Sequence, residues 1–576
     1  MIAGNAGFLV VGVCLWLIIS AGLAEEGDDM ERNATVSEKV VRQSQSLCDG
    51  EREFVQKRKQ IVLETLNSLE INCTENSVPH IALLGSGGGQ RATVAMVGSL
   101  YQLEKDNLLD TLLYLAGVSG STWAMASVYS EPHWSSNMDG AVSKLSNDRL
   151  EMDEALAWLN EREKDEYFSL TDLWAVLTSV GIMKQDMRHL SDEADRNATN
   201  PYPIYSAIEK QCFSDGPTEG KWFEISPHEA GFPALGLFVE TSLLGSKFQS
   251  GELLEKKPEM DMVKLQGVLG SAMADEKIAT DNIPSWLIVD EESSSQKYWR
   301  AIKIFYKLSG LMGHISKEPA AQPDWTTLWK IFNGMVHNNQ SARLPSNTSE
   351  ERQEVLQPLG LQLLQAAKTW CETLQDETLK RQVSAILKHV DPLIHKWEWG
   401  TTTNFLYQYQ DPSIPPCLQS NETIHLIDAG SLINVPYPSF LGDKRDIDLI
   451  IAPEYSAGNM FETLTLARNY SAELMKPFPE IDDEILKDRD FPKDCYVLEG
   501  GETAPTIIYM PLFNQQNCKD AEEFKAKMDE YNTFQLPYTQ EKIDFVLETA
   551  KANMKNNRET LLREIKKAVL RREKKE

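Results

Sequence analysis

Residues 81–123 read IALLGSGGGQRATVAMVGSLYQLEKDNLLDTLLYLAGVSGSTW and contain one pattern twice. A short apolar run, Ile81–Leu84, leads into a glycine-rich turn and then into a helical stretch, Arg91–Leu103. The pattern repeats as apolar Leu112–Ala116, a tight Gly-Val-Ser-Gly-Ser turn and a second helical stretch, Trp123–Val128. Two consecutive strand–turn–helix units predict an α/β fold with a mostly parallel central sheet and flanking helices.

The rest of the chain is interpreted as four segments by composition and periodicity. They are residues 1–24, 25–50, 51–550 and 551–576. The first is apolar, the second is polar and is expected to form a flexible lead-in, and the third holds one large domain that opens with a helix over 51–70. Acidic and Ser-rich insertions at 290–295 and 341–354 are typical of surface loops. The fourth is the basic end of an amphipathic helix predicted from Glu541 onward.

The amino-terminal segment allows more than one interpretation. Residues Phe8–Leu23 form an apolar run, and the small residues Gly22 and Ala24 suit a signal-peptidase site. No Lys or Arg precedes the run, and it is slightly short for a bilayer span, so a cleaved signal peptide, an uncleaved anchor and a buried helix all stay open. Sequons for N-linked glycans, which favour the secretory pathway, occur at Asn33, Asn72, Asn197, Asn339, Asn347, Asn421 and Asn469.

Composition excludes several classes of protein. The 576 residues include 57 Lys and Arg against 86 Asp and Glu, and a net charge of −29 would repel a nucleic-acid backbone. Hydrophobic residues at 42% exclude a wholly disordered chain. The eight cysteines form no CxxC pair and have no His at ligand spacing, so no metal or cofactor site is predicted.

The turn at 117–121 reads Gly-Val-Ser-Gly-Ser and resembles GxSxG, the nucleophile elbow, although Ser121 stands where that pattern has its last glycine. Such a turn must be sharp enough to push the Ser119 hydroxyl out of the end of a strand, and its small neighbours relieve the crowding that results. A strand before it and a helix after it favour this interpretation over an ordinary glycine-rich turn.

The earlier glycine loop, 86–90, offers consecutive main-chain amides at the start of a helix, which suit an oxyanion. The same geometry could bind a phosphate. However, GxxxxGK[ST] is absent, and GxGxxG fails because position 90 is Gln90. Arg91 could hold the phosphate of a lipid head group or form a structural ion pair.

A serine nucleophile needs a base, and two kinds are available. No histidine follows His425, so the chain lacks the late histidine of the α/β-hydrolase order. A triad with His389, His395 or His425 stays open. The simpler alternative is a Ser119–Asp428 dyad, since Asp428 stands at the end of a predicted strand before Ala-Gly, although many such aspartates only cap helices.

Three motifs taken together resemble the group IV cytosolic phospholipase A2 family, most closely its gamma-type members. They are Ser-Gly-Gly-Gly-x-Arg-Ala at 86–92, Gly-Val-Ser-Gly-Ser-Thr-Trp at 117–123 and Asp-Ala-Gly at 428–430. Residues 226–253 and 396–407 also resemble family segments, and the resemblance extends over residues 50–550.

The resemblance implies a patatin-like, lysophospholipase-type catalytic domain with lid-like insertions. By position it implies Ser119 as nucleophile, Asp428 as base, Gly88 and Gly89 as oxyanion hole, and Arg91 and Arg445 as substrate-binding residues. The family segment Ser-Phe-Asp-Phe-Ser-Ala reads APEYSA at 452–457, and this departure puts the packing beside the site in question.

The expected function is therefore that of a phospholipase A2 or lysophospholipase, which hydrolyses the acyl ester of glycerophospholipids through an acyl-serine intermediate without a cofactor. A neutral-lipid or simple ester hydrolase and a catalytically idle lipid-binding protein are the alternatives. The expected partner is a phospholipid membrane surface rather than nucleic acid, and no protein partner is predicted.

Calcium dependence and membrane attachment are expected to differ from those of some relatives. Calcium-dependent relatives carry an amino-terminal β-sandwich, whereas here about 80 residues precede the glycine loop and contain no Asp-rich loops. Gamma-type enzymes end in a prenylation box, whereas this chain ends RREKKE. Membrane contact is then expected from the amino-terminal run and the basic tail. The resemblance implies the cytosol or endoplasmic reticulum, and a signal peptide would imply the secretory pathway.

Overall fold

The computed structural model describes residues 40–147, 152–181, 186–275, 368, 371–372, 377–396, 398–533 and 538–575. The chain divides into the units Met1–Val40 and Val41–Glu576, and all described residues except Val40 belong to the second. The predicted signal peptide or anchor lies outside the described residues, as do the predicted surface loops at 290–295 and 341–354. Within the described part, no helix is long and apolar enough to cross a membrane.

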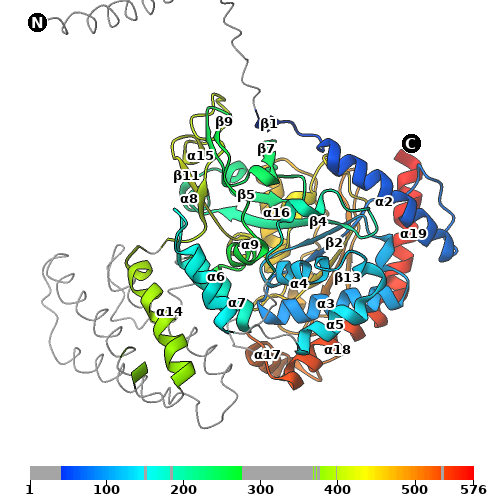
Figure 1. Ribbon diagram of the computed structural model, residues 1–576. Helices are drawn as coiled ribbons and strands as arrows, with labels where there is room; N and C mark the ends of the chain where they lie inside the picture. The colour runs from blue at the N-terminus through cyan, green and yellow to red at the C-terminus, as the bar shows by residue number, and fades with distance from the viewer. Residues whose placement is uncertain are drawn as a thin grey trace, which may run out of the picture. The chain divides into compact units, whose positions relative to one another are not determined.

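Five parallel strands form the centre of the main sheet, in the order β4-β3-β2-β12-β14 (Figure 1). They are β2 (Ile81–Gly85), β3 (Tyr114–Gly117), β4 (Tyr202–Glu209), β12 (Leu449–Glu454) and β14 (Thr506–Pro511). Every residue of these strands is buried, as expected for parallel strands that are covered on both faces. The predicted α/β fold with a parallel central sheet is confirmed.

Antiparallel strands extend this sheet at both ends, and the sequence analysis did not predict them. Beyond β4 follow β5 (Trp222–Ile225), β6 (Glu229–Phe232), β7 (Leu237–Glu240) and β1 (Arg42–Gln43), and beyond β14 follows β13 (Tyr496–Leu498). Each has four residues or fewer, which is too short for a clear alternation of apolar and polar side chains.

The boundary of the predicted flexible lead-in needs correction. Residues 25–39 lie outside the described part, but residues 40–50 are ordered rather than flexible. β1 pairs with β7, with Arg42 opposite Phe238, and α2 (Asp49–Ser68) begins at the amino-terminal cap Cys48. The polar composition of this segment does not indicate a strand, and the strand that pairs with β1 lies almost two hundred residues further along the chain. The sequence analysis therefore did not predict β1.

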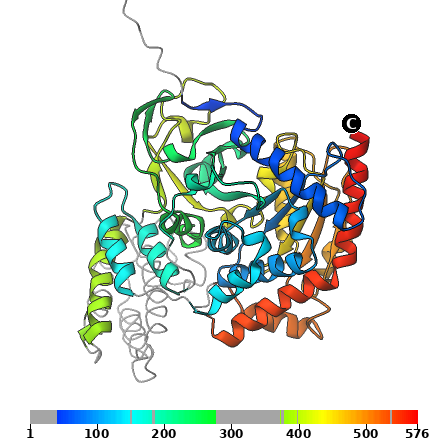
Figure 2. The ribbon, with the colours of Figure 1, turned by 45° about the vertical axis from the view of Figure 1, so that its right-hand side comes forward.

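A helix from the carboxyl-terminal part covers the first of the two helices that follow the glycine-rich turns. In Figure 1, α3 (Gln90–Lys105) runs beside α18 (Gln540–Asn556), and α4 (Gly120–Tyr129) packs against α3; Figure 2 shows the same part of the molecule from another side. Gly98 permits the close approach of α3 to α18, because a Cβ atom there would lie 2.7 Å from the carbonyl oxygen of Leu547. This packing anchors the helices that begin at the two glycine-rich turns.

The predicted carboxyl-terminal helix is two helices, because the first ends at Asn556 and α19 (Arg558–Lys575) begins after Asn557. α19 packs against β12, and Arg572 is 7% exposed. Its guanidinium donates to Asp446 and Asp448, and Lys575 is paired with the same two carboxylates. Residues 551–575 are therefore an integrated part of the domain rather than a separate basic tail.

Candidate active site

Ser119 lies in a strained turn between β3 and α4. Its backbone has φ 52° and ψ −122°, a conformation that non-glycine residues rarely adopt and that is typical of a nucleophile elbow. Gly120 lets this turn pack against the neighbouring glycine loop, because a Cβ atom there would lie 2.0 Å from the carbonyl oxygen of Gly89. The predicted sharp strand–turn–helix around Ser119 is thus confirmed in its geometry.

The glycine loop follows β2, which pairs in parallel with β3 so that Gly85 lies opposite Gly117. Both turns therefore leave the same edge of the sheet. Gly88 and Gly89 have φ angles of 152° and 59°, and Gly89 caps the start of α3. Among the hydrogen bonds between described residues, neither amide N–H donates to an acceptor, so both can serve a ligand.

Asp428 reaches this edge from the opposite direction. Strand β11 (Thr423–Asp428) runs antiparallel to β4, with Asp428 opposite Ala207. On the same strand, Tyr205 pairs with Gly117 at the end of β3. Strands β3 and β11 thus end two residues apart along β4, which brings Asp428 beside the turn that carries Ser119.

The carboxyl group of Asp428 is 1% exposed and has no cationic partner among the described residues. Burial raises its pKa to about 6, and hydrogen bonds from the Ser119 side chain and the Gly430 N–H act in the opposite direction. Oδ1 accepts the Gly430 N–H at 2.8 Å, whereas Oδ2 is buried without a partner of good geometry in the described part. An incompletely hydrogen-bonded carboxylate with a raised pKa is suited to accept a proton near neutral pH.

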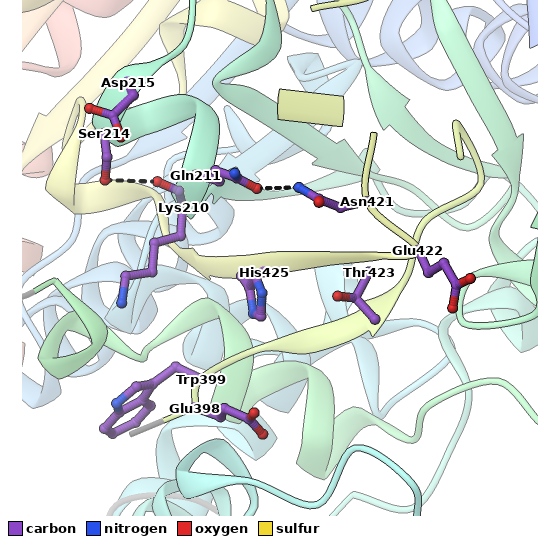
Figure 3. Close-up of a pocket in the computed structure, with 10 residues that line it drawn as sticks. All are labelled: Lys210, Gln211, Ser214, Asp215, Glu398, Trp399, Asn421, Glu422, Thr423 and His425. Atoms are coloured by element: carbon purple, nitrogen blue, oxygen red, sulfur yellow. Dashed lines mark hydrogen bonds between the residues drawn. The ribbon is translucent and has the colours of Figure 1, made fainter. Parts of the chain in front are cut away.

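The described histidines of the alternative triad point elsewhere. His425 is three residues before Asp428 on β11, so its side chain lies on the opposite face of the strand. It lines a cavity of about 560 Å³ together with Lys210 and Trp399 (Figure 3), and its Nδ1 lies 3.1 Å from Thr401 Oγ1. His389 contacts Asn160 on α6 (Met152–Arg162). The side chain of His395 lies outside the described part.

Arg91, which the resemblance implies as a substrate-binding residue, is engaged within the protein. Its side chain is buried, and its guanidinium donates to the carbonyl oxygens of Tyr455 and Tyr531 and to Thr533 Oγ1. Burial also lowers the pKa of Arg91. Because its donors are used by the main chain of distant segments, Arg91 ties α3 to the end of β12 and to residues 531–533 rather than facing a ligand.

Arg445 is also displaced from its predicted role. It is 3% exposed and pairs with Glu51 at 2.8 Å and Glu224 at 3.0 Å. Although burial disfavours its charge, Glu224 and Glu51 hold the pKa of Arg445 well above the usual value. This pairing joins the start of α2 to β5, so Arg445 stabilises the sheet extension and is not free to bind substrate.

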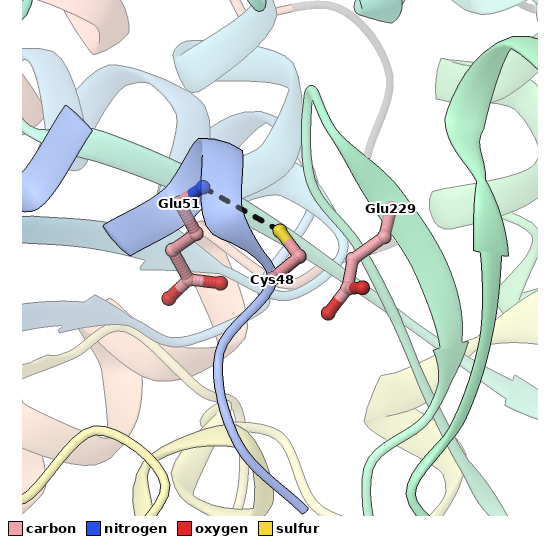
Figure 4. Close-up of side chains that lie close together, drawn as sticks. All are labelled: Cys48, Glu51 and Glu229. Atoms are coloured by element: carbon pink, nitrogen blue, oxygen red, sulfur yellow. Dashed lines mark hydrogen bonds between the residues drawn. The ribbon is translucent and has the colours of Figure 1, made fainter. Parts of the chain in front are cut away.

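Cys48, Glu51 and Glu229 lie close together in Figure 4, with side-chain ligand atoms within 4.8 Å of one another. Glu51 is already paired with Arg445, and Glu229 with Arg42. Burial and the charge of Glu229 raise the pKa of the Cys48 thiol to about 11, so the thiolate that metals prefer is disfavoured. These existing partners make the cluster a poor metal site.

Two residues that the sequence analysis missed border the glycine loop. The Asn434 side chain donates to the carbonyl oxygen of Gly87 at 3.2 Å and to Ser456 Oγ at 2.6 Å. Ser456 lies in the segment 452–457 that the sequence analysis compared with the family, but that comparison did not single out the serine. Asn434 belongs to no motif, and only its position six residues after Asp428 could have suggested it.

Comparisons with known proteins show which family and fold this chain shares. Residues 81–276 match the family model of the lysophospholipase catalytic domain. The chain is 33% identical to cytosolic phospholipase A2 gamma of Mus musculus, over 90% of this chain and 91% of that protein. It is 32% identical to the Homo sapiens protein of that name, over 89% of this chain and 94% of the relative. The solved structure of human GIVD cytosolic phospholipase A2 superposes with a TM-score of 0.66 at 23% identity, over 92% of this chain and 68% of that one.

Proposed function

The chain belongs to the cytosolic phospholipase A2 family and is a phospholipase A2, and we propose that it acts through a Ser119–Asp428 dyad. The observation that carries this proposal is the convergence of three features at one sheet edge. They are the strained Ser119, the buried Asp428 carboxyl group that accepts from the Ser119 side chain, and the amides of Gly88 and Gly89, which have no acceptor within the described part of the chain. A dyad of this kind needs no histidine.

In the proposed reaction Asp428 accepts the proton of the Ser119 hydroxyl as Oγ attacks the ester carbonyl of a glycerophospholipid. The carbonyl oxygen becomes an oxyanion, which the Gly88 and Gly89 amides stabilise at the positive end of α3. The intermediate then releases the lysophospholipid with a proton from Asp428, which leaves an acyl-Ser119. Asp428 next takes a proton from water as the water attacks this ester, and the second intermediate then breaks its bond to Ser119 Oγ. Asp428 returns the proton to this oxygen, and free fatty acid leaves.

The catalytic step as proposed needs no calcium, because Asp428 supplies the base and main-chain amides supply the oxyanion donors. The measurement is hydrolysis of phospholipid vesicles in excess chelator and with added calcium. A rate in chelator within about tenfold of the rate with calcium, or ~1.4 kcal/mol of barrier, supports the proposal, and a larger loss contradicts it.

The same acyl-serine could also serve lysophospholipid substrates or a neutral ester. We favour a phospholipid at a membrane surface because the relatives are named phospholipases. The alternatives are separated by comparing phospholipid vesicles, lysophospholipid, triacylglycerol emulsion and a soluble nitrophenyl ester at equal enzyme concentration. Preference for triacylglycerol or for the soluble ester would support a neutral-lipid or simple ester hydrolase.

Labelling tests the dyad and separates the enzyme from an idle lipid-binding protein. A fluorophosphonate probe should label the wild-type chain covalently, and Ser119→Ala should remove both labelling and hydrolysis. Ser136→Ala is a matched control, since Ser136 is an exposed serine remote from the elbow in the sequence. Retained labelling in Ser119→Ala would show that another residue is the nucleophile.

The compartment is a separate part of the proposal. We propose that the chain enters the secretory pathway, because Cys212 and Cys417 form a disulfide with a Cα–Cα distance of 5.5 Å. Disulfides persist in oxidising compartments and are rare in the cytosol. The sequon residues Asn72, Asn197 and Asn469 are exposed, so glycans could be accommodated there.

A glycosidase tests this compartment. Chain expressed in cells with its complete amino terminus should increase in mobility after digestion with a peptide N-glycosidase. Substituting Asn72, Asn197 and Asn469 by Gln should reduce the shift. If digestion leaves the mobility of the chain unchanged and Cys212 and Cys417 have free thiols, the enzyme is in the cytosol, the compartment that the names of its relatives give.

A further inference from the structure

We infer that Asn434 is a positioning residue that aims the oxyanion-hole amide of Gly88. The inference rests on the dyad and oxyanion hole proposed above and adds a residue to them. Asn434 lies six residues after Asp428, on the segment that follows the short helix η9 (Ala429–Ser431). It is half-buried and bridges the loop that carries the base and the loop that carries the oxyanion donors.

Asn434 holds Gly87 by two hydrogen bonds. The Gly87 N–H donates to the main-chain oxygen of Asn434 at 2.9 Å, and the Asn434 side-chain amide donates to the Gly87 carbonyl oxygen at 3.2 Å. The Gly87 carbonyl and the Gly88 N–H belong to one peptide group, and in a trans peptide they point in opposite directions. Fixing the carbonyl therefore fixes the direction of the N–H.

The same hydrogen bond also strengthens the donor. A peptide carbonyl that accepts a hydrogen bond is polarised, which makes the N–H of that peptide a better donor. Without the side chain of Asn434, the Gly87–Gly88 peptide could rotate more freely, because glycines on both sides allow many backbone conformations. An oxyanion hole works only when its donors are directed beforehand at the position of the oxyanion.

The side chain of Asn434 is itself held in place by residues 452–457, the segment that departs from the family motif. Its amide donates to Ser456 Oγ at 2.6 Å, and the Ser456 N–H donates to Glu454 Oε1 at 2.8 Å. The Glu454 carboxylate is anchored in turn by Thr463 Oγ1 at 2.6 Å and by the Tyr509 hydroxyl at 3.2 Å. A buried chain of hydrogen bonds thus runs from β12 and β14 to the glycine loop.

The oxygen of the Asn434 amide lies against both loops of the site. A Cβ atom on Gly87 would be 2.2 Å from Asn434 Oδ1, and a Cβ atom on Gly430 would be 2.7 Å from it. The same Cβ atoms would lie 2.8 Å from Ser119 Cβ and 3.1 Å from Asp428 Oδ1, respectively. Asn434 therefore occupies the space between nucleophile, base and oxyanion loop.

The test is the kinetics of Asn434→Ala in the full-length enzyme on a soluble ester. We expect kcat and kcat/KM to fall together by about tenfold to a hundredfold with KM unchanged, because the lost interaction acts in the transition state. Affinity for a trifluoromethyl ketone, which becomes an oxyanion adduct of Ser119, should fall by the same factor. Affinity for an ether-linked phospholipid analogue, which forms no oxyanion, should not change.

A matched control separates positioning from stability. Asn200 is also buried, and it accepts the Ser135 N–H and donates to the Pro132 carbonyl oxygen at 2.7 Å. Asn200→Ala should lower the melting temperature without lowering kcat. Equal losses of ketone and ether affinity in Asn434→Ala, or a kcat within threefold of wild type, would overturn the inference.

Two further variants complete the test: Ser456→Ala, for which we expect a smaller loss, and the inactive Ser119→Ala. Ser456→Ala keeps Asn434 but removes its support, and we expect a loss of kcat of a few fold; it also serves as the test should Asn434→Ala fail to fold. An unchanged kcat in Ser456→Ala together with an unfolded Asn434→Ala would overturn the inference. Hydrolysis retained by Ser119→Ala would overturn the dyad itself, whereas an inactive Ser119→Ala beside a normal Asn434→Ala would overturn only the role of Asn434.

Discussion

The turns after β2 and β3 and the edge formed by residues 445–448 and α19 both contain buried polar groups, but they treat them in opposite ways. At the turns, one oxygen of Asp428 and the amides of Gly88 and Gly89 lack hydrogen-bond partners among the described residues. At the edge, Asp448 is fully buried and accepts from the His80 N–H and from Arg572. Buried polar groups are usually satisfied, so several unsatisfied groups that converge on one pair of turns suggest contact with a ligand, whereas an isolated one such as His80 Nε2 does not.

The largest effect is expected where the unsatisfied carboxylate is removed. Asp428→Asn should lower the hydrolysis of phospholipid vesicles by about 10⁴-fold, because in serine hydrolases the loss of one member of the catalytic group removes most of the catalysis. The melting temperature should not fall. Asp139→Asn, on the surface, is the control and should retain full activity. Near-normal turnover in Asp428→Asn would remove the dyad and revive a histidine base.

At the edge formed by residues 445–448 and α19, a change at Arg445 is expected to lower stability rather than activity. Arg445→Met leaves Glu51 buried without its counter-charge and leaves Glu224 with Lys444 alone, and breaking a buried ion pair in this way costs about 3–5 kcal/mol. The free energy of unfolding, measured with urea, should fall by that amount, whereas KM for a soluble ester should stay unchanged in the folded fraction. A selective rise in KM at unaltered stability would restore the predicted contact with substrate.

These two regions also show what the sequence could reveal. The turns at Gly87–Gly89 and Gly117–Ser119 were predicted because their backbone requirements are local and leave glycine where a side chain cannot fit. Arg445 was misassigned because its partners Glu51 and Glu224 lie 394 and 221 residues away, and no local pattern identifies them. The disulfide of Cys212 with Cys417 was missed for the same reason, whereas the strands β5–β7 were missed because each has only four residues.

The pH dependence of activity tests the environment of Asp428. Its pKa is raised to about 6, and the proposed base is active only when deprotonated, so activity should rise as pH increases through this value. Between pH 7 and pH 5, kcat/KM for a soluble ester should fall by about tenfold, with folding checked by circular dichroism at both values. If kcat/KM instead fell to half near pH 4, the carboxylate of Asp428 would be solvated, and this result would contradict its burial.

The smallest effect is expected from the remaining basic residues of α19. Lys566 and Lys574 are exposed, and each lysine near an anionic bilayer would contribute about 1 kcal/mol to binding. Replacing both by Gln should therefore weaken binding about thirtyfold if α19 lies on the membrane. We expect the affinity for vesicles to fall by less than about threefold. Arg572 and Lys575 of the same helix are paired with Asp446 and Asp448, so these two positive charges face the domain rather than a membrane. Sedimentation with anionic vesicles at low ionic strength measures this, and Arg572→Gln should instead lower stability. A thirtyfold loss in the double variant would show that α19 binds lipid despite its ion pairs.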